Sequence, residues 1–487
     1  MNLSQKVALN TLLLVGGRVA VAASGLLGTV VATRYLGRDE FGQLLTAMTF
    51  VGLFAIFTDV GVWTVAAREI AKRPQEEQRI LSAVSAIGLG LSAGTVLVAL
   101  LGTFVLYGGG DRELVRVGIL ISLGGVLITA PLGASSAHLT AHQRAVPAAI
   151  SGLTTGVGFG VALGVVIAAD LGFAGIAAAY AFSALVGAVP PIAAALRRVS
   201  VRPGGEATFA WTLLRAALPQ GAILAITAIY FRIDTVLLSL LGTDGDVALY
   251  GLAYRVLEFL LIVPIFAMTT LFPEIARTPA HSDRLLMLVQ GALSGVLLLT
   301  VPMVCVMVGF APEVVRLAGG AEFDAAADVL RLLIVAVAFS FPATVFFNAL
   351  VAMGRQGILI WSLVGVLAVN VALNVALVGP LAARGSALAL VITEVAALTA
   401  AWRLFGRVSR RPRLQRPVRL AGAGLVCAAS VAAIRLPLDS PAGHPVLVLV
   451  LGSAAVTAVF VAAAVALRAV PVEVTSAITQ LRDRRSV

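Results

Sequence analysis

Residues 285–310 read LLMLVQGALSGVLLLTVPMVCVMVGF, and no charged residue interrupts them. A helix needs about 20 mostly apolar residues to cross the hydrocarbon core of a bilayer. Because that core holds no water, every backbone N–H and C=O group must be paired within the protein, and a helix pairs its own. This stretch therefore predicts a transmembrane helix.

Similar stretches recur along the whole chain. Of its 487 residues, 60% are apolar and 12% are charged, whereas a soluble domain carries about 25% charged residues. We predict an all-α polytopic membrane protein with about 14 transmembrane helices, at 8–33, 41–66, 80–106, 114–137, 146–169, 173–196, 213–241, 247–272, 285–310, 328–352, 357–379, 385–405, 418–435 and 446–467. The thirteenth is the weakest, because Gly422 and Gly424 interrupt it early.

The net charge of +11 is explained by topology, because cytoplasmic loops of membrane proteins collect Lys and Arg. Bases gather in alternate loops, such as 68–79 and 403–419, while loops such as 108–111 and 243–246 are short and poor in bases. The alternation predicts a multi-pass protein of the cytoplasmic membrane with both termini in the cytoplasm. No nucleic-acid partner is expected. Cys305 and Cys427 lie inside predicted spans, so neither a disulfide, a metal site nor a cofactor is predicted.

The chain also contains an internal repeat. Landmarks recur at offsets between 205 and 211 residues: Tyr35-Leu36-Gly37 with Leu240-Leu241-Gly242, Leu139 to Arg144 with Leu350 to Arg355, and Gly175-Ile176-Ala177 with Gly385-Ser386-Ala387. The offset spans six helices, an even number, so the two halves have the same orientation in the membrane. We predict two parallel six-helix lobes, 1–200 and 201–410, followed by two additional helices and a cytoplasmic tail in 411–487.

Short motifs mark both halves. They are Tyr35-Leu36-Gly37, Phe41-Gly42, Asp59-Val60-Gly61, Arg68-Glu69-Ile70-Ala71, Tyr230-Phe231-Arg232-Ile233-Asp234, Tyr250-Gly251-Leu252-Ala253-Tyr254-Arg255 and Leu271-Phe272-Pro273-Glu274-Ile275. In their order and spacing the chain resembles the polysaccharide-transporter branch, the Wzx-type oligosaccharide flippases, of the multidrug/oligosaccharidyl-lipid/polysaccharide (MOP) exporter superfamily. The resemblance covers nearly the whole chain. It implies two lobes around a central cavity that opens alternately to each side, and a polyprenyl-diphosphate-linked oligosaccharide as substrate. In related lipid II flippases the last two of fourteen spans lie beside a groove for the lipid tail.

Charged residues inside spans are costly and are therefore candidates for function. At 1.5 Å per residue, Arg18 lies about 16 Å into the first span, and Arg255 and Glu258 lie about 12 and 16 Å into the eighth. Asp59 lies toward the inner end of the second span. An arginine offers paired donors that match diphosphate oxygens. Arg18, Arg255, Glu258 and Asp59 are the candidates for the substrate cavity, although Arg18 could instead latch to an acid, and Arg255 and Glu258 could pair with each other.

Oxygen-bearing side chains gather in the second half. Glu394, Asn348, Asn370 and Asn374 are candidates for coupling transport to Na⁺ or H⁺, although asparagine also joins membrane helices through ordinary hydrogen bonds. Asn370 and Asn374 share a helix face at positions i and i+4. Arg232 and Asp234 lie near the outer end of the seventh span, where we expect them to snorkel to the surface.

These features leave three candidate functions. The first is a flippase that moves a lipid-linked oligosaccharide, a precursor of cell-surface polysaccharide, with that substrate, membrane lipids and a coupling ion as partners. The second is a multidrug cation antiporter of the sister branch, which the mid-membrane Arg18 and the two extra spans disfavour. The third is a polytopic polysaccharide-assembly enzyme, disfavoured because the loops predicted to lie outside are too short to form a site. No Walker A loop occurs, so ATP hydrolysis is not expected.

Overall fold

The computed structural model describes residues 3–128, 132–199, 202–412, 417–435 and 445–469, and within these ranges the regular elements are helices and no strand occurs. By packing, the chain divides into two compact units, Met1–Ala248 and Leu249–Val487. The boundary between them follows the seventh predicted span, not the sixth. The predicted boundaries at residues 200 and 410 were drawn from the internal repeat and not from packing. They stay predictions.

The first unit contains nine helices and the start of a tenth in its described residues: α1 (Leu3–Ala55), α2 (Val62–Lys72), α3 (Glu77–Leu106), α4 (Glu113–Ile128), α5 (Leu132–Ala141), α6 (Val146–Ala168), α7 (Gly172–Leu196), α8 (Ala207–Tyr230), α9 (Ile233–Leu241) and α10 (Asp244–Leu260). The seventh predicted span belongs to this unit because α8 packs on α2 and α3, and α9 packs on α1. Leu213 and Ala217 of α8 join the buried cluster formed by α2, α3 and α5.

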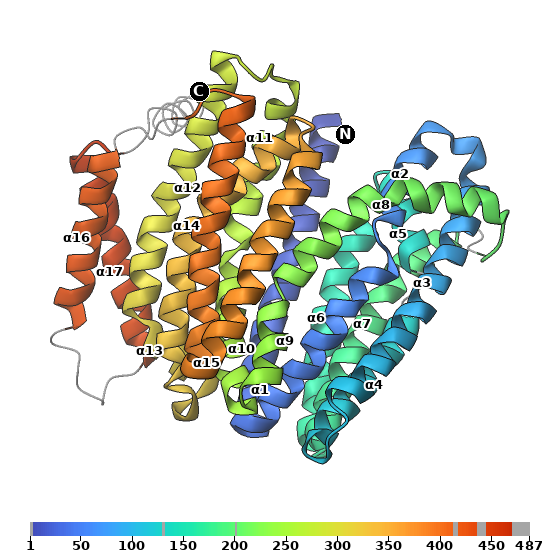
Figure 1. Cartoon of the computed structure of the whole chain (residues 1–487), viewed down its shortest axis with the longest axis horizontal. Coiled ribbons are helices and arrows are strands. Elements are labelled where there is room, and N and C mark those ends of the chain that lie inside the picture. The colour runs from blue at the N-terminus through green and yellow to red at the C-terminus, as the bar shows by residue number, and fades with distance from the viewer. Residues whose placement is uncertain (1–2, 129–131, 200–201, 413–416, 436–444, 470–487) are drawn as a thin grey trace. The chain divides into compact units, whose positions relative to one another are not determined.

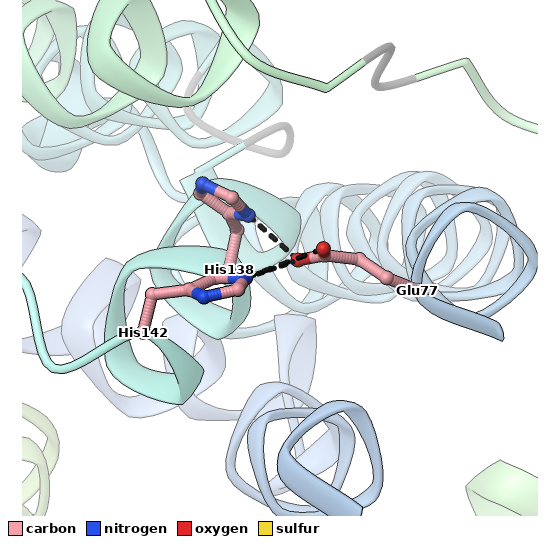
Figure 2. Close-up of side chains that lie close together, drawn as sticks. All are labelled: Glu77, His138 and His142. Carbon is pink, nitrogen blue, oxygen red and sulfur yellow. Dashed lines mark hydrogen bonds and ion pairs between the residues drawn. The ribbon is translucent and has the colours of Figure 1, made fainter. Parts of the chain in front are cut away.

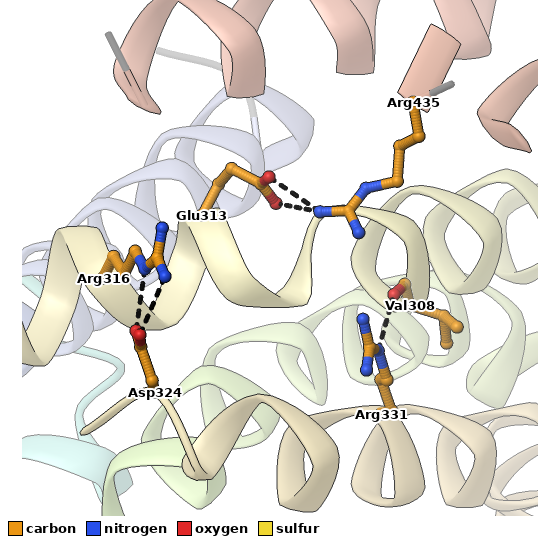
Figure 3. A network of polar contacts seen from close by, with 6 residues as sticks. All are labelled: Val308, Glu313, Arg316, Asp324, Arg331 and Arg435. Atoms are coloured by element: carbon orange, nitrogen blue, oxygen red, sulfur yellow. Dashed lines mark hydrogen bonds and ion pairs between the residues drawn. The ribbon is translucent and has the colours of Figure 1, made fainter. Parts of the chain in front are cut away.

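The second unit continues with α11 (Ile262–Arg277), α12 (Asp283–Gly309), α13 (Ala311–Gly319), α14 (Ala326–Ala352), α15 (Gln356–Val408), α16 (Pro417–Arg435) and α17 (Pro445–Ala466). The thirteenth predicted span is the unbroken helix α16, which runs beside α17 (Figure 1). Both pack on α12 through a buried cluster that includes Phe310, Cys427 and Phe460. Glu313 of α13 accepts two bonds of 2.7 Å from Arg435, which ties α16 to that end of the unit (Figure 3).

Two of the longest helical segments are hairpins of two spans. Segment α1 turns at Gly37 (φ 74°, ψ −176°), and α15 turns at Ala382 (φ 50°, ψ −131°). A residue without a Cβ adopts this positive φ at Gly37 without steric cost. Ten stretches of the described residues are long and apolar enough to cross a membrane. Two of these stretches, Ala23–Lys72 and Gln356–Val408, contain the turns at Gly37 and Ala382 and each account for two predicted spans. The fourth predicted span corresponds to α4 with α5 and the eighth to α10 with α11, so each of the fourteen predicted spans has a helical counterpart.

One turn is built twice, at the offset that the repeat predicts. After α5, Arg144 N donates to Leu139 O at 2.8 Å, and Gln143 has φ 52°. After α14, Arg355 N donates to Leu350 O at 2.9 Å, and Gly354 has φ 73°. Both are Schellman-type helix ends with a left-handed residue after the last turn. The shared geometry supports the duplication of the chain.

Several predicted spans are interrupted, which the apolar pattern did not indicate. The second breaks between Ala55 and Val62, the seventh at Phe231 and Arg232, and the eighth at Leu261. Each of these three spans is therefore built from two helical pieces. Breaks at membrane depth are tolerated only where the backbone is buried in protein or lines a cavity, so these positions mark where a site can form.

Candidate functional site

The turn between α9 and α10 is bound to α1 and α3 by a set of polar contacts. We call Gln43, Tyr107, Arg112, Ser239 and Asp244 the polar latch. The hydroxyls of Tyr107 and Ser239 share a hydrogen bond of 2.9 Å, and both residues are almost fully buried. Arg112 donates to the Ser239 carbonyl at 2.7 Å, and Gln43 Nε2 donates to Asp244 Oδ2 at 2.8 Å. The polar latch therefore fixes the turn between α9 and α10 against α1 and the C-terminal end of α3, at the end of the unit where Gly37 lies.

The local sequence makes this close approach possible. Gly42 leaves room for the Asp244 carbonyl, which a Cβ at that position would overlap. Tyr107 is placed at the C-terminal end of α3, where its ring meets Phe50 edge-on with centroids 5.5 Å apart. Sequence reasoning found Phe41-Gly42 as a motif but missed the latch, because its partners lie between 127 and 201 residues apart.

Asp59 occupies the break in the second span. Val60 and Gly61 both have positive φ, 42° and 79°, and Gly61 ends the break. The Asp59 carboxylate accepts from Gly61 N at 3.2 Å and from Trp63 N at 3.1 Å, so it caps the first turn of α2. Gly221 of α8 approaches this break so closely that a Cβ there would overlap the Val60 carbonyl.

A cavity of about 270 Å³ opens beside this break, within the first unit. Its polar lining comes from Thr58, Asp59, Ser92 and Ser136, and its remaining walls are mainly apolar. The Ser92 hydroxyl is buried and has no hydrogen-bond partner among the described residues. The cavity can hold water or a small polar group. A carboxylate in its wall would repel a diphosphate but can accept hydrogen bonds from sugar hydroxyls.

Arg255 and Glu258 form an ion pair of 2.9 Å on α10, in the second unit. About a third of the arginine side chain and 44% of the glutamate side chain are exposed. Of the two alternatives drawn from their spacing, the structure contains the pairing of the two residues with each other.

The two asparagines predicted to share a face do so on the first arm of α15. Asn374 Nδ2 donates to the Asn370 carbonyl at 3.0 Å and lies 3.3 Å from Asn370 Oδ1, and both residues are fully buried. Asn370 Nδ2 has no partner among the described residues. Glu394, on the second arm, is 7% exposed. Asn370 and Glu394 each lie twelve residues from the turn at Ala382, so they lie at a similar depth along the hairpin.

The other predicted residues are placed as follows. Asn348 donates to the Thr344 carbonyl of its own helix at 2.8 Å. Asp234, in the first turn of α9, is 2% exposed and lies buried within the first unit. The expectation that it snorkels to the surface was therefore wrong. The Arg232 guanidinium packs against Gly52 of α1, where a Cβ would overlap it. The backbone of Arg18 is helical, but its side chain lies outside the described residues.

Family models match most of the chain. The model for polysaccharide biosynthesis proteins matches residues 7–279, and the model for the lipid II flippase MurJ matches residues 189–440. No curated relative matches the sequence.

Solved structures with a similar fold include a lipid II flippase and multidrug transporters. A lipid II flippase MurJ in an inward closed conformation matches with a TM-score of 0.75 and 14% identity, covering 94% of this chain and 99% of its own. An inward-facing multidrug resistance MATE transporter matches with a TM-score of 0.66 and 16% identity, covering 80% and 94%. A MOP superfamily transporter from Pyrococcus furiosus matches with a TM-score of 0.62 and 16% identity, covering 82% and 95%.

The first family model covers more than half of the chain, and the fourteen-span helical fold agrees with it. The protein therefore belongs to the polysaccharide biosynthesis protein family, within the MOP exporter superfamily.

Proposed function

We propose that this protein is a flippase that moves a polyprenyl-diphosphate-linked oligosaccharide across the cytoplasmic membrane by alternating access. The observation that carries the proposal is the extent of the fold. The match to the lipid II flippase covers 94% of the chain, whereas the matches to MATE transporters cover between 80% and 86%. The difference, between 8% and 14% of 487 residues, is about 40 to 70 residues, a length that suffices for two membrane spans such as α16 and α17. This supports a lipid-linked substrate over the sister function of cation antiport.

In this proposal the lipid tail stays in the hydrocarbon, and only the sugar-diphosphate head needs a polar path. Arg18 and Arg255 would contact the diphosphate, because a guanidinium remains charged and offers paired donors. Glu258 would orient Arg255 through their ion pair. Asp59 would accept from sugar hydroxyls in the cavity beside the break in the second span.

The polar latch would close the outer opening, because its turn follows the seventh span at the end that the loop charges place outside. Opening to that side then requires the release of Gln43 from Asp244 and of Arg112 from Ser239. Hydrogen bonds to a charged group contribute about 1.5–3 kcal/mol each. Two such bonds are strong enough to favour the state closed to the outside over the open state, and weak enough to be broken in each transport cycle.

The energy for net transport would come from an ion or from the membrane potential. Asn370, Asn374 and Glu394 supply buried oxygen atoms on the two arms of one hairpin, which suits Na⁺ or H⁺. Asn348, bonded to its own helix, would stand at the edge of this site. One charge moving through 100 mV yields about 2.3 kcal/mol, enough to bias the carrier about fifty-fold.

The test is a flipping assay with the purified protein in proteoliposomes. We expect translocation of a polyprenyl-diphosphate oligosaccharide without ATP, accelerated by an inside-negative potential or an ion gradient. The same vesicles should not accumulate a lipophilic cationic dye against a proton or sodium gradient. Dye transport without flipping of the lipid-linked sugar would overturn the proposal in favour of antiport.

A further inference from the structure

Two of the four histidines in the chain meet on one carboxylate, at the end of the first unit opposite the polar latch. Glu77 Oε1 lies 2.7 Å from His138 Nδ1 and 3.0 Å from His142 Nε2 (Figure 2). Glu77 is the first residue of α3, while His138 lies in α5 and His142 directly follows it. None of the three belongs to the site described above.

The helix geometry sets this arrangement. Positions i and i+4 of a helix lie on the same face, and the imidazole rings of His138 and His142 are 4.7 Å apart. His138 is 3% exposed. Beside it, Ala134 and Ala137 of α5 pack with Ile80 and Leu81 of α3 in one buried cluster. The two helices are therefore held in register by packing, and the three side chains meet on a fixed frame.

The three ligand atoms are close to the spacing that a zinc ion requires. They all lie within 4.8 Å of one another. Zinc binds imidazole nitrogen at about 2.0–2.1 Å and carboxylate oxygen at about 2.0–2.2 Å, so ligand atoms on a tetrahedron lie about 3.3–3.5 Å apart. The contact of 2.7 Å would have to widen by about 0.6 Å and that of 3.0 Å by about 0.3 Å. Small rotations of the side chains supply such shifts.

The composition of the cluster restricts the ion. Mg²⁺ and Ca²⁺ take oxygen ligands, whereas two imidazoles and one carboxylate suit Zn²⁺ and its neighbours among the divalent first-row metals. The side chain of His142 is 40% exposed, which gives an ion access and leaves room for water as a fourth ligand. A site with three protein ligands and one open position is common for zinc.

We propose that Glu77, His138 and His142 form a binding site for a divalent transition metal ion, with Zn²⁺ as the preferred ion. The bound ion would join the start of α3 to the end of α5.

We expect the affinity of this site for the metal ion to be modest. The His138 Nε2 atom is buried and has no hydrogen-bond partner in the described part of the chain. Zinc-binding histidines usually donate this second N–H to an acceptor, and loss of that bond weakens metal binding about 10–100-fold.

The alternative is a hydrogen-bonded cluster that binds no metal, and substitutions separate the two. Glu77→Gln keeps the shape and an oxygen acceptor but removes the charged ligand. His142→Ala removes an exposed imidazole, so the fold is retained. His281→Ala is the matched control, because His281 is exposed in the loop between α11 and α12.

The experiment uses the full-length protein in detergent, stripped with a chelator and titrated with ZnCl₂ by calorimetry. We expect one ion per chain, a raised Tm on saturation, and the visible absorption of tetrahedral cobalt when Co²⁺ replaces Zn²⁺. Glu77→Gln and His142→Ala should each weaken binding at least tenfold, while His281→Ala should bind as the parent does. Absence of binding by the parent, or equal affinity in Glu77→Gln, His142→Ala and the parent, would overturn the proposal.

Discussion

Arg112→Ala tests whether the polar latch holds one opening of the transporter closed. The substitution removes the 2.7 Å bond to the Ser239 carbonyl and the contact of the guanidinium with the Tyr107 ring, 5.7 Å from its centroid. Gln43, Tyr107 and Ser239 keep their other bonds. The closed state should therefore lose part of its stabilisation without a change in fold.

The size of the effect follows from the geometry. A hydrogen bond to a charged donor contributes about 1.5–3 kcal/mol when buried. Arg112 is half-buried, so solvent screening reduces this to about 1–2 kcal/mol. At about 1.4 kcal/mol for each factor of ten, the open population should rise about 5- to 30-fold.

The assay is labelling of Thr46→Cys by a membrane-impermeant maleimide, after Cys305 and Cys427 are replaced by alanine. Thr46 is 2% exposed and lies one turn after Gly42, on the face of α1 that meets Asp244. Its labelling rate reports how often the latch opens. We expect the rate to rise about 5- to 30-fold in Arg112→Ala.

The control is Arg116→Ala in the same background. Arg116 lies in the first turn of α4 and has the same charge, but its hydrogen bonds go to backbone carbonyls of residues 107–109 and not to the turn between α9 and α10. Its removal should leave the labelling rate within about twofold of the parent. An unchanged rate in Arg112→Ala, or an equal rise in Arg116→Ala, would refute the reasoning.

Three further predictions concern orientation and the substrate path. A cysteine at Gly109 should be labelled from outside intact cells, while cysteines at Gln75 and Arg411 should not, because the loop charges place those two inside; outside labelling at Arg411 would reverse the topology. Asp59→Ala should destabilise the detergent-solubilised protein by about 0.5–2 kcal/mol through loss of the cap of α2, whereas Asp59→Asn should unfold at nearly the parent temperature. Equal Tm values for the parent, Asp59→Ala and Asp59→Asn would exclude the capping role. If Arg18 contacts the diphosphate, Arg18→Lys should lose much of the transport, because lysine lacks the paired donors; full activity of both Arg18→Lys and Arg18→Ala at normal expression would remove Arg18 from the mechanism.

Much of the fold could be predicted because membrane burial acts on local sequence. Apolar length and loop charge identified the spans, including α16 despite Gly422 and Gly424. The breaks could not be predicted from hydropathy, because the charges at Asp59 and Arg232 stand within stretches that are apolar on average. What decides each break is the neighbouring helix, as with Gly221 against the Val60 carbonyl.

The candidate site was less predictable, because contacts across the fold have no local signal. The pairing of Arg255 with Glu258 and of Asn370 with Asn374 follows from helix spacing, and both pairs are present. The contact of Glu77 with His138 joins residues 61 positions apart. His138 and His142 lie between the fourth and fifth predicted spans, and no prediction from the sequence included them.

The most direct test of the flippase proposal is a reversible lock on the latch during flipping. Gln43→Cys and Asp244→Cys, in the background without native cysteines, place thiols where the two side chains now bond at 2.8 Å. In proteoliposomes, a short reducible thiol cross-linker should stop flipping of the polyprenyl-diphosphate oligosaccharide, and a reducing agent should restore it. Each single-cysteine variant should flip at the same rate before and after this treatment. Flipping that continues at the same rate in the fully cross-linked protein would contradict alternating access through this opening.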